Sequence, residues 1–345
     1  MNATAHPLQL PDDTLARYLE RHIAGFRGPL LSVKFKGGQS NPTYHLKAGS
    51  GDYVLRRKPP GILLASAHAV DREFRVLQAL HGGKVPVAEP YHLCLDESVI
   101  GSMFYVMEYI DGRIFWDPSL PDLTVQERGA CFDEILSTLA AIHSVPMEAS
   151  GLADYGKPGN YFERQAGRWS KQYRDSETQS SAAMDALIEQ LPLRCPADDG
   201  SVSLVHGDFR IDNLLFGKND LRVRAVVDWE LSTLGHPLAD LGYFCMALRL
   251  PRNPALPGLA GLDRSELGIP SEAAMLARYA ELTGRAIPAD WPFVLAFSFF
   301  RLAAIAQGVA KRVQQGNASS EQAAQAGQMT VLLAQMGLQV LHESP

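Results

Sequence analysis

The sequence predicts an α+β fold in which a small, sheet-rich first third precedes a larger, helix-rich remainder. Two observations lead to this prediction. Short β-rich runs separated by turn residues dominate up to about residue 110, and helical periodicity dominates beyond it. With 345 residues, 46% of them hydrophobic and 20% charged, the chain has enough apolar material for two such parts. The simplest organisation is a small β-lobe joined at about residue 110 to a larger α-lobe.

The first third begins with a helix-like segment at about residues 12–25. Three β-rich runs follow, LSVKF (31–35), TYHLKA (43–48) and YVLRR (53–57), and they are joined by GGQSN and GSGD, which have turn composition. Three strands in so short a segment predict an antiparallel meander.

A helix is predicted next, because apolar residues recur at helical spacing from Val70 to Leu80 and Ser66 is suited to cap its start. Two further strands follow, PVAEPYHLCLDES and SMFYVMEYIDG, and the second ends in an Asp-Gly turn at 111–112. In the remainder, the only strand signals lie around 202–229. The segments with helical periodicity are 124–144, 161–190, 271–283, 291–315 and 319–342.

Charge and cysteine content restrict the class of protein. The net charge of −6 provides no basic field for nucleic acid or an anionic membrane. The four cysteines form no C-x-x-C pair, which favours reduced thiols over a disulfide frame or zinc knuckle. The N-terminus lacks the pattern of a signal peptide, and the apolar run 291–300 is stopped by Arg301 and is too short to cross a bilayer. These features predict a cytoplasmic protein with no membrane or nucleic-acid partner.

A polar insert between two apolar runs, LVHGDFRIDNLLF (204–216), is the strongest functional signal. The chain continues through a GKND turn into a second apolar strand that ends in AVVDWE (225–230), which predicts a hairpin. Counting outward from that turn places Asp228 opposite the polar insert. We therefore expect Asp208, Asn213 and Asp228 to converge.

These side chains suit phosphoryl transfer. The oxygens of Asn213 and Asp228 are hard ligands, suited to Mg²⁺ that carries a nucleotide phosphate. Asp208 can accept a proton from an attacking hydroxyl group, or orient it. Asp212 is interpreted as structural, and Asp240 as a residue that braces the loop or caps a helix. His206 is expected to shape the loop through a backbone hydrogen bond.

His206-Gly207-Asp208 with Asn213, followed by Asp228, resembles the H-x-D-x-x-x-x-N loop and downstream metal aspartate of protein-kinase-like enzymes. The form VHGDFRIDNLLF…VVDWE is similar to the aminoglycoside phosphotransferase and choline kinase branch. Within that branch, YVLRRKPPG and DWELSTLGHPLADLGYF resemble phosphotransferase domains found alone in bacteria or fused to acyl-CoA dehydrogenases. The resemblance covers about residues 30–315 and implies a bilobal protein-kinase-like fold, with ATP and Mg²⁺ as cofactors and a small-molecule hydroxyl compound as substrate.

The resemblance also implies a nucleotide site. It divides the chain into a nucleotide-binding lobe (1–107), a hinge (108–112) and a catalytic, substrate-binding lobe (113–345). The loop GGQSNPTYHL would cover the phosphates, Arg56 would clamp them with Glu73 as its partner, and Val54 would cover adenine. The loop departs from G-x-G-x-x-G, and Arg56 stands where protein kinases use lysine. The residues assigned to the nucleotide are Gly37, Gly38, Ser40, Asn41, Val54, Arg56, Glu73 and, through the hinge backbone, Glu108 and Ile110.

Other classes of function fit less well. A metallohydrolase would need several more His or Asp ligands than the scattered histidines provide, and a serine hydrolase would need a G-x-S-x-G elbow, which is missing. A nucleotide-binding pseudokinase module stays as an alternative, although it would be expected to lack the aspartate or the asparagine and neither is missing. An aminoglycoside kinase or a choline or ethanolamine kinase stays as an alternative within the family, although no dense acidic cluster follows residue 230.

The segment NYFERQAGRWSKQYRDS (160–176) bears on the acceptor. Phe162, Ala166, Trp169 and Tyr173 are predicted to share one helical face. A basic side formed by Arg164, Arg168 and Lys171 is either solvated or contacts an anionic substrate, such as a hydroxy acid or a hydroxyacyl thioester.

Overall fold

The computed structural model describes residues 9–35, 41–59, 69–253, 256–312, 314 and 320–343, with the backbone alone for 320–326. Contacts between residues divide the chain into two compact units. The first comprises Met1–Ile114, Glu148–Leu152 and Asn213–Ser232, and the second comprises Phe115–Met147, Ala153–Asp212 and Thr233–Pro345. The first unit carries an antiparallel sheet and the second is mainly helical, so the predicted α+β, bilobal fold is confirmed.

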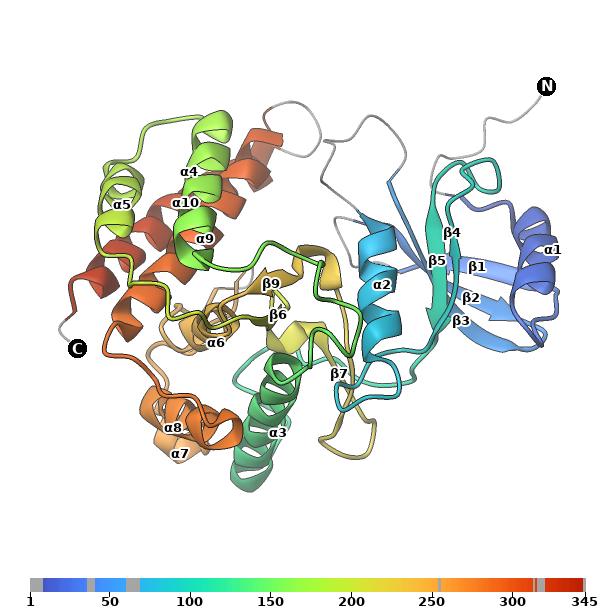
Figure 1. Ribbon diagram of the computed structural model, residues 1–345, viewed down its shortest axis with the longest axis horizontal. Coiled ribbons are helices and arrows are strands. Elements are labelled where there is room, and N and C mark those ends of the chain that lie inside the picture. The colour runs from blue at the N-terminus through green and yellow to red at the C-terminus, as the bar shows by residue number, and fades with distance from the viewer. Residues whose placement is uncertain are drawn as a thin grey trace. The chain divides into compact units, whose positions relative to one another are not determined.

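The first unit is built on a five-stranded antiparallel sheet with the order β1-β2-β3-β5-β4 (Figure 1). The predicted meander is confirmed by the pairing of β1 with β2 and of β2 with β3. Helix α2 begins at Val70, and Ser66, its predicted cap, lies outside the described residues. The strands are β1 (Leu30–Lys34), β2 (Thr43–Ala48), β3 (Gly51–Arg57), β4 (Pro90–Cys94) and β5 (Phe104–Glu108), and the helices are α1 (Asp12–His22) and α2 (Val70–Leu80).

The two faces of this sheet have different partners because side chains alternate along each strand. On one face, Leu46, Leu55 and Val106 form a core with Leu15 and Leu19 of α1. On the other face, α2 contacts β4 and β5. The strand positions between the core residues therefore point toward α2, and they include Val54 and Arg56.

A hairpin of β7 (Leu214–Phe216) and β8 (Val223–Val226) also belongs to the first unit. The amide of Arg113 donates to the carbonyl of Phe216, and the amide of Phe216 donates to the carbonyl of Arg113. Gly112 permits this approach, since a Cβ atom there would lie 2.5 Å from the Phe216 carbonyl oxygen. The amide of Val226 donates to the carbonyl of Pro86 at 2.8 Å. The hairpin is thereby fixed to the segments that adjoin the sheet.

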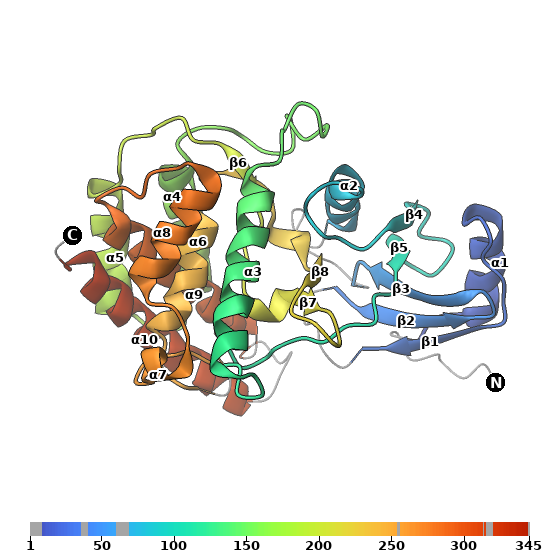
Figure 2. The ribbon, with the colours of Figure 1, turned by 90° about the horizontal axis from the view of Figure 1, so that it is seen from below.

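The second unit is formed mainly by helices, several of which pack around α9 (Figure 2). Helix α9 contacts α4, α5, α6 and α10. A two-stranded sheet pairs β6 (Ser203–Val205) with β9 (Thr233–Gly235). The helices are α3 (Val125–His143), α4 (Tyr161–Ser176), α5 (Ala182–Leu193), α6 (Leu238–Cys245), α7 (Arg264–Leu267), α8 (Glu272–Thr283), α9 (Trp291–Arg312) and α10 (Ser320–Leu341), and a short 3₁₀ helix, η3 (Met246–Leu248), follows α6.

The predicted helices differ from the structure at α4, α5 and α6. The run 161–190 is divided between α4 and α5, because Ser181 caps a new helix by accepting a hydrogen bond from the Met184 amide. Helix α6 was not predicted, and every one of its residues is buried, so it shows no amphipathic period.

Helix α9 lies within the segment 291–315 that was predicted as helical, and it continues beyond the apolar run 291–300 through Arg301 to Arg312. By length and composition alone, α9 is one helix among the described residues that could cross a membrane. However, 78% of its most apolar stretch is buried inside the structure, and helices in the core of globular proteins can be equally long and apolar.

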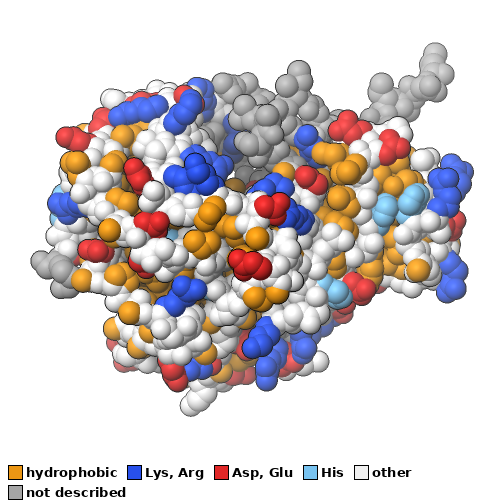
Figure 3. Space-filling view, in the orientation of Figure 1, with side chains coloured by type: hydrophobic (Ala, Val, Ile, Leu, Met, Phe, Trp, Pro, Cys, Tyr) orange, Lys and Arg blue, Asp and Glu red, His pale blue; other side chains and the backbone are white. Residues whose placement is uncertain are grey.

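The molecular face in Figure 3 carries Lys and Arg side chains interspersed with Asp and Glu. On this face, local electrostatics therefore depends on individual ion pairs and clusters, which are described next for each unit.

Candidate active site

Arg56 of β3 lies at the centre of a cluster of carboxylates in the first unit. Its Nε lies 2.8 Å from Oε2 of Glu73 on α2. Its terminal nitrogen donates to Oδ1 of Asp228 at 2.5 Å, and the same nitrogen lies 3.5 Å from Oε2 of Glu230. The Arg56 side chain is 10% exposed, so these interactions are only weakly screened by water.

Glu73 is held by two further donors. The side-chain amide of Asn41 donates to Oε1 at 2.7 Å, and the hydroxyl of Tyr105 donates to Oε2 at 3.1 Å. Asn41 was assigned to the nucleotide from the sequence, and in the structure its amide orients the partner of Arg56. Tyr105 was missed, although its place on β5 beside Arg56 follows from the strand register.

The cluster fixes the charge of Arg56. Burial acts to lower the pKa of Arg56, but Glu73 and Asp228 outweigh burial and raise that pKa above its ordinary value. Burial raises the pKa of Glu73, while Arg56 and the two hydrogen-bond donors oppose that shift. The permanent cation of Arg56 thus faces the carboxyl groups of Glu73, Asp228 and Glu230.

Asn213 and Asp228 lie at the same end of the β7–β8 hairpin. Leu214 pairs with Val226, and the amide of Val227 donates to the Asn213 carbonyl at 3.0 Å. Asp228 has a left-handed backbone, with φ 67° and ψ 58°, which is uncommon for a residue other than glycine. The hairpin therefore brings together the two residues predicted as metal ligands.

The other residues assigned to the nucleotide are placed as follows. Val54 is buried on β3, on the same strand face as Arg56. The amide of Glu108, at the end of β5, donates to the Glu89 carbonyl at 2.9 Å, and Ile110 follows that strand. Gly37, Gly38 and Ser40 lie outside the described residues.

Asp208 belongs to the second unit, in a loop that follows β6. The carboxylate of Asp240, on α6, accepts hydrogen bonds from the amides of His206 and Gly207 at 2.6 and 2.8 Å. Nδ1 of His206 accepts from the Asp208 amide at 3.1 Å. Asp240 therefore braces the loop and His206 shapes it, as the sequence predicted. The convergence of Asp208 with Asn213 and Asp228 stays a prediction, because those residues belong to different units.

The side chain of Asp208 is hydrogen-bonded to Tyr243 of α6. Burial, followed by the charge of Asp208, raises the pKa of Tyr243, so its hydroxyl keeps its proton. Nearby, Arg210 donates to both carboxylate oxygens of Asp212, at 3.0 and 2.7 Å. Asp212 thus has an ion-pair partner, in keeping with its structural interpretation.

A second layer of buried polar residues supports the loop. Nε2 of His143 on α3 lies 3.3 Å from Oδ2 of Asp240, and its Nδ1 lies 2.7 Å from the hydroxyl of Tyr279 on α8. His143 and Asp240 are 97 positions apart in the sequence, so no local pattern indicates their contact.

Of the three basic residues predicted on one side of α4, two have partners within the protein. Its apolar face, Phe162, Ala166, Trp169 and Tyr173, is buried as predicted. On the basic side, Arg164 donates to the carbonyls of Gly159 and Lys157, and Lys171 pairs with Asp175 at 2.7 Å.

Arg168 differs from these two residues, since within the described ranges it has no carboxylate partner. Its guanidinium lies 5.4 Å from the ring centroid of Trp169. Burial, followed by the charge of Arg301, lowers the pKa of Arg168. Arg301 of α9, only 4% exposed, donates to the Gly207 carbonyl and stacks on Trp169 and Tyr243. Two arginines therefore lie close to the loop that carries Asp208, and Arg301 was not singled out by the sequence.

In the ranges that the structure describes, no group of three or more His, Cys, Asp and Glu side chains is arranged to hold a metal ion. Mg²⁺ usually takes one or two carboxylates and keeps water and substrate phosphate as its other ligands. Asn213 and Asp228, which provide one amide oxygen and one carboxylate at the same hairpin end, fit that kind of site.

Comparisons with known proteins agree with these features. The model of the phosphotransferase enzyme family matches residues 33–297. Acyl-CoA dehydrogenase family member 10 from Mus musculus is 44% identical over 348 residues, which cover 98% of this chain and 32% of that protein. The chain thus spans about a third of this relative's length.

Solved structures show the same fold. A protein from Ralstonia eutropha JMP134, provisionally assigned as an aminoglycoside phosphotransferase, has a TM-score of 0.89 at 49% identity, covering 98% of this chain and 100% of that one. Spectinomycin phosphotransferase, solved with ADP and spectinomycin, has a TM-score of 0.62 at 15% identity, covering 97% and 100%. The resemblance expected from the sequence is thereby confirmed.

Proposed function

Because the chain belongs to the phosphotransferase enzyme family, we propose that it transfers the terminal phosphoryl group of ATP to a hydroxyl group of a small molecule. The observation that carries this proposal is the cluster in which Arg56 contacts both Glu73 and Asp228 within one unit. A buried, permanently charged guanidinium can bind phosphate oxygens in a bidentate manner.

In this proposal, residues 1–107 bind the nucleotide and the segment 108–112 contacts adenine. The amide of Glu108 already donates to Glu89, so we assign the Glu108 carbonyl and the Ile110 amide to adenine. Val54 covers the ring, and Gly37, Gly38, Ser40 and Asn41 belong to the loop over the phosphates. Residues 113–345 contribute the loop of Asp208 and the acceptor site.

Asn213 and Asp228 are the residues that would hold Mg²⁺. When bound, the metal supplies positive charge that offsets the negative charge of the phosphates. Support comes from the shared hairpin end of the two residues and from the carboxyl groups of Glu73 and Glu230, which lie with Asp228 around Arg56.

Asp208 acts on the acceptor hydroxyl. A new bond forms between the acceptor oxygen and the γ-phosphorus while the bond from that phosphorus to the β,γ-bridging oxygen breaks, and the hydroxyl proton passes to Asp208. Tyr243 orients the Asp208 carboxylate, and Asp240 holds the loop backbone. Asp240 is a positioning residue, since it acts through the amides of His206 and Gly207.

We propose further that the acceptor carries an anionic group, as a hydroxy acid or a hydroxyacyl thioester would. Support for an anion comes from Arg168, which has no carboxylate partner in the described ranges, and from its neighbour Arg301. The pairing of Lys171 with Asp175 and of Arg164 with backbone carbonyls makes those two residues less available. All four cysteines are free thiols, so we propose a reducing compartment such as the cytoplasm.

A coupled assay of ADP release tests the function. The purified chain is incubated with ATP, Mg²⁺ and a panel of hydroxy acids, hydroxyacyl thioesters, choline and amino sugars. We expect turnover with an anionic acceptor, and a loss of about 10²–10⁴-fold in Asp208→Asn with retained ATP binding. Preference for a cationic acceptor would refute the anionic assignment, and no turnover with any acceptor while ATP binds would favour a pseudokinase.

A further inference from the structure

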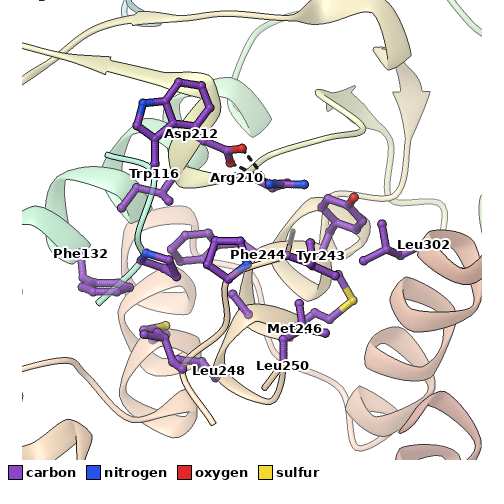
Figure 4. Close-up of a pocket in the computed structure, with 17 residues that line it drawn as sticks. Trp116, Phe132, Arg210, Asp212, Tyr243, Phe244, Met246, Leu248, Leu250 and Leu302 are labelled. Atoms are coloured by element: carbon purple, nitrogen blue, oxygen red, sulfur yellow. Dashed lines mark hydrogen bonds and ion pairs between the residues drawn. The ribbon is translucent and has the colours of Figure 1, made fainter. Parts of the chain in front are cut away.

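A pocket lies in the helical unit, next to the loop of Asp208. It has about 620 Å³ of empty space, including its opening to solvent (Figure 4). Its lining is mainly apolar and comes from α3, α6, η3, α8, α9 and the segment 250–259. All of its lining residues belong to the second unit, so the pocket is formed within a single compact body.

Tyr243 connects this pocket to the predicted base. The Tyr243 side chain lines the pocket, and Tyr243 is hydrogen-bonded to Asp208. Arg210 and Asp212, from the same loop as Asp208, line the pocket as well. Figure 4 shows their ion pair on one side of the pocket, with Met246 and Leu250 across from it. A molecule in the pocket therefore has one end close to the loop of Asp208.

The polar groups of the lining are largely satisfied by one another. Arg210 donates to both oxygens of Asp212, and the Tyr243 hydroxyl is engaged by Asp208. The rest of the wall offers aliphatic, methionine and aromatic side chains, including Phe132, Phe244 and Met275. Such a wall gains by excluding water and offers few hydrogen-bond partners to a sugar hydroxyl.

The rim of the pocket carries an unusual side chain. Trp116 lines the pocket and is 66% exposed, the second most exposed of the large hydrophobic residues described. An exposed indole at an apolar opening loses water-accessible surface when an apolar ligand enters, which favours binding.

We propose that this pocket binds an unbranched hydrocarbon arm of the phosphate acceptor, and that the acceptor hydroxyl lies where the arm leaves the pocket, at Asp208. This inference rests on the proposed function and narrows its substrate class to amphiphiles: a hydroxyl group, an anionic group and an apolar tail. Polar acceptors without a tail leave the pocket filled with water and bind more weakly.

The first test needs no substitution. The chain is assayed with ATP and straight-chain hydroxy acids that differ only in the length of the tail beyond the hydroxyl. Each added methylene should raise kcat/KM roughly fourfold until the pocket is full, which corresponds to ~0.8 kcal/mol per buried CH₂. Turnover of the series with no dependence on tail length would overturn the pocket assignment and leave the proposed function intact.

The second test shortens the pocket. Ala247 lines it, so Ala247→Phe should abolish the gain in kcat/KM from the longer tails. Ala277 is exposed on α8, the helix that also contributes Met275 to the lining, and Ala277→Phe is the matched control that should keep the gain. Equal chain-length dependence in the two folded variants would contradict the inference.

The third test reads binding without turnover. A saturated straight-chain fatty acid, which cannot be phosphorylated, should bind in calorimetry, compete with the acceptor and bind more weakly to Ala247→Phe. Binding of the fatty acid without phosphorylation of any hydroxy acid would uphold the pocket and overturn the proposed function. A fatty acid that does not bind, or that binds without competing with the acceptor, would overturn the pocket assignment.

Discussion

Asp240→Asn is a sharp test of the buried brace under the loop of Asp208. The substitution keeps the size of the side chain and removes its charge and one acceptor oxygen. The amides of His206 and Gly207 both donate to the carboxylate, so one of them would face the new NH₂ group without an acceptor. Asp240 is fully buried, so water cannot replace the lost partner.

The expected cost follows from these contacts. A hydrogen bond to a charged group contributes about 1.5–3 kcal/mol, and an unsatisfied buried donor costs about 1–3 kcal/mol. These two terms overlap, so we expect a destabilisation of ~2–4 kcal/mol. In a folding unit of roughly 200 residues, each kcal/mol lowers the melting temperature by about 2–4 °C. Calorimetry should therefore show a fall of about 5–15 °C, and kcat should fall with it.

The effect of pH gives a second criterion. Burial acts to raise the pKa of Asp240, but its hydrogen bond with His143, the nearby histidines and the Gly207 amide reverse this and place that pKa below its ordinary value. The pKa of an aspartate in the unfolded state is about 3.9. Because the pKa of Asp240 is lower in the folded state, its ionised carboxylate stabilises the fold above that pH, and this stabilisation is lost as the pH falls through the folded-state pKa. The difference in stability between wild type and Asp240→Asn should be constant above about pH 5 and shrink below about pH 4. Asp122, which is exposed, provides the control Asp122→Asn. If Asp240→Asn melts like that control at neutral pH, the brace contributes nothing and the reasoning is refuted.

Three further predictions concern the proposed site. Asp228→Ala should abolish the Mg²⁺-dependent gain in ATP affinity measured by calorimetry, and an undiminished gain would show that Asp228 only shapes the end of β8. Arg168→Gln should raise the KM of an anionic acceptor roughly three- to tenfold. The increase should be smaller at high salt, because salt screens a partly exposed ion pair between Arg168 and the acceptor. Lys171→Gln is its control, since Lys171 pairs with Asp175, and equal KM values in the two variants would exclude Arg168 from the acceptor site. Tyr243→Phe should lower kcat about 10–100-fold at saturating acceptor by removing a hydrogen bond to a charged group, and an unchanged kcat would mean that Tyr243 only packs.

Much of the fold and part of the site could be predicted from the sequence because the signals are local. Strand alternation indicated that Val54 and Arg56 share a face, and the hairpin turn indicated that Asn213 and Asp228 lie at one end. The resemblance to protein-kinase-like enzymes implied Glu73, on the next helix, as the partner of Arg56, and the two side chains lie 2.8 Å apart.

The residues that were missed act through tertiary packing. Tyr243 and Arg301 lie on helices that are buried on nearly every side, so hydrophobic period does not show which of their residues approach Asp208. His143 sits at the end of an ordinary helix, and its meeting with Asp240 depends on how α3 packs near β6. Conversely, the sequence analysis grouped Arg164, Arg168 and Lys171 although Asp175, four residues after Lys171, was already available as an i,i+4 partner. The backbone carbonyl that engages Arg164 is visible only in the structure.

The contact between Arg56 and Asp228 has a consequence for the order of binding. The Arg56 guanidinium lies 2.5 Å from Asp228 and also pairs with Glu73, so its charge is shared between two carboxylates. If Asp228 holds the metal and Arg56 the phosphates, as proposed, a nucleotide without metal would bring its phosphates toward the Asp228 carboxylate, and a metal ion alone would compete with the guanidinium for that carboxylate. A preformed complex of the two would supply a new partner to each residue. We therefore expect rapid mixing with the preformed ATP–Mg²⁺ complex to give faster association than mixing in which either component is added first.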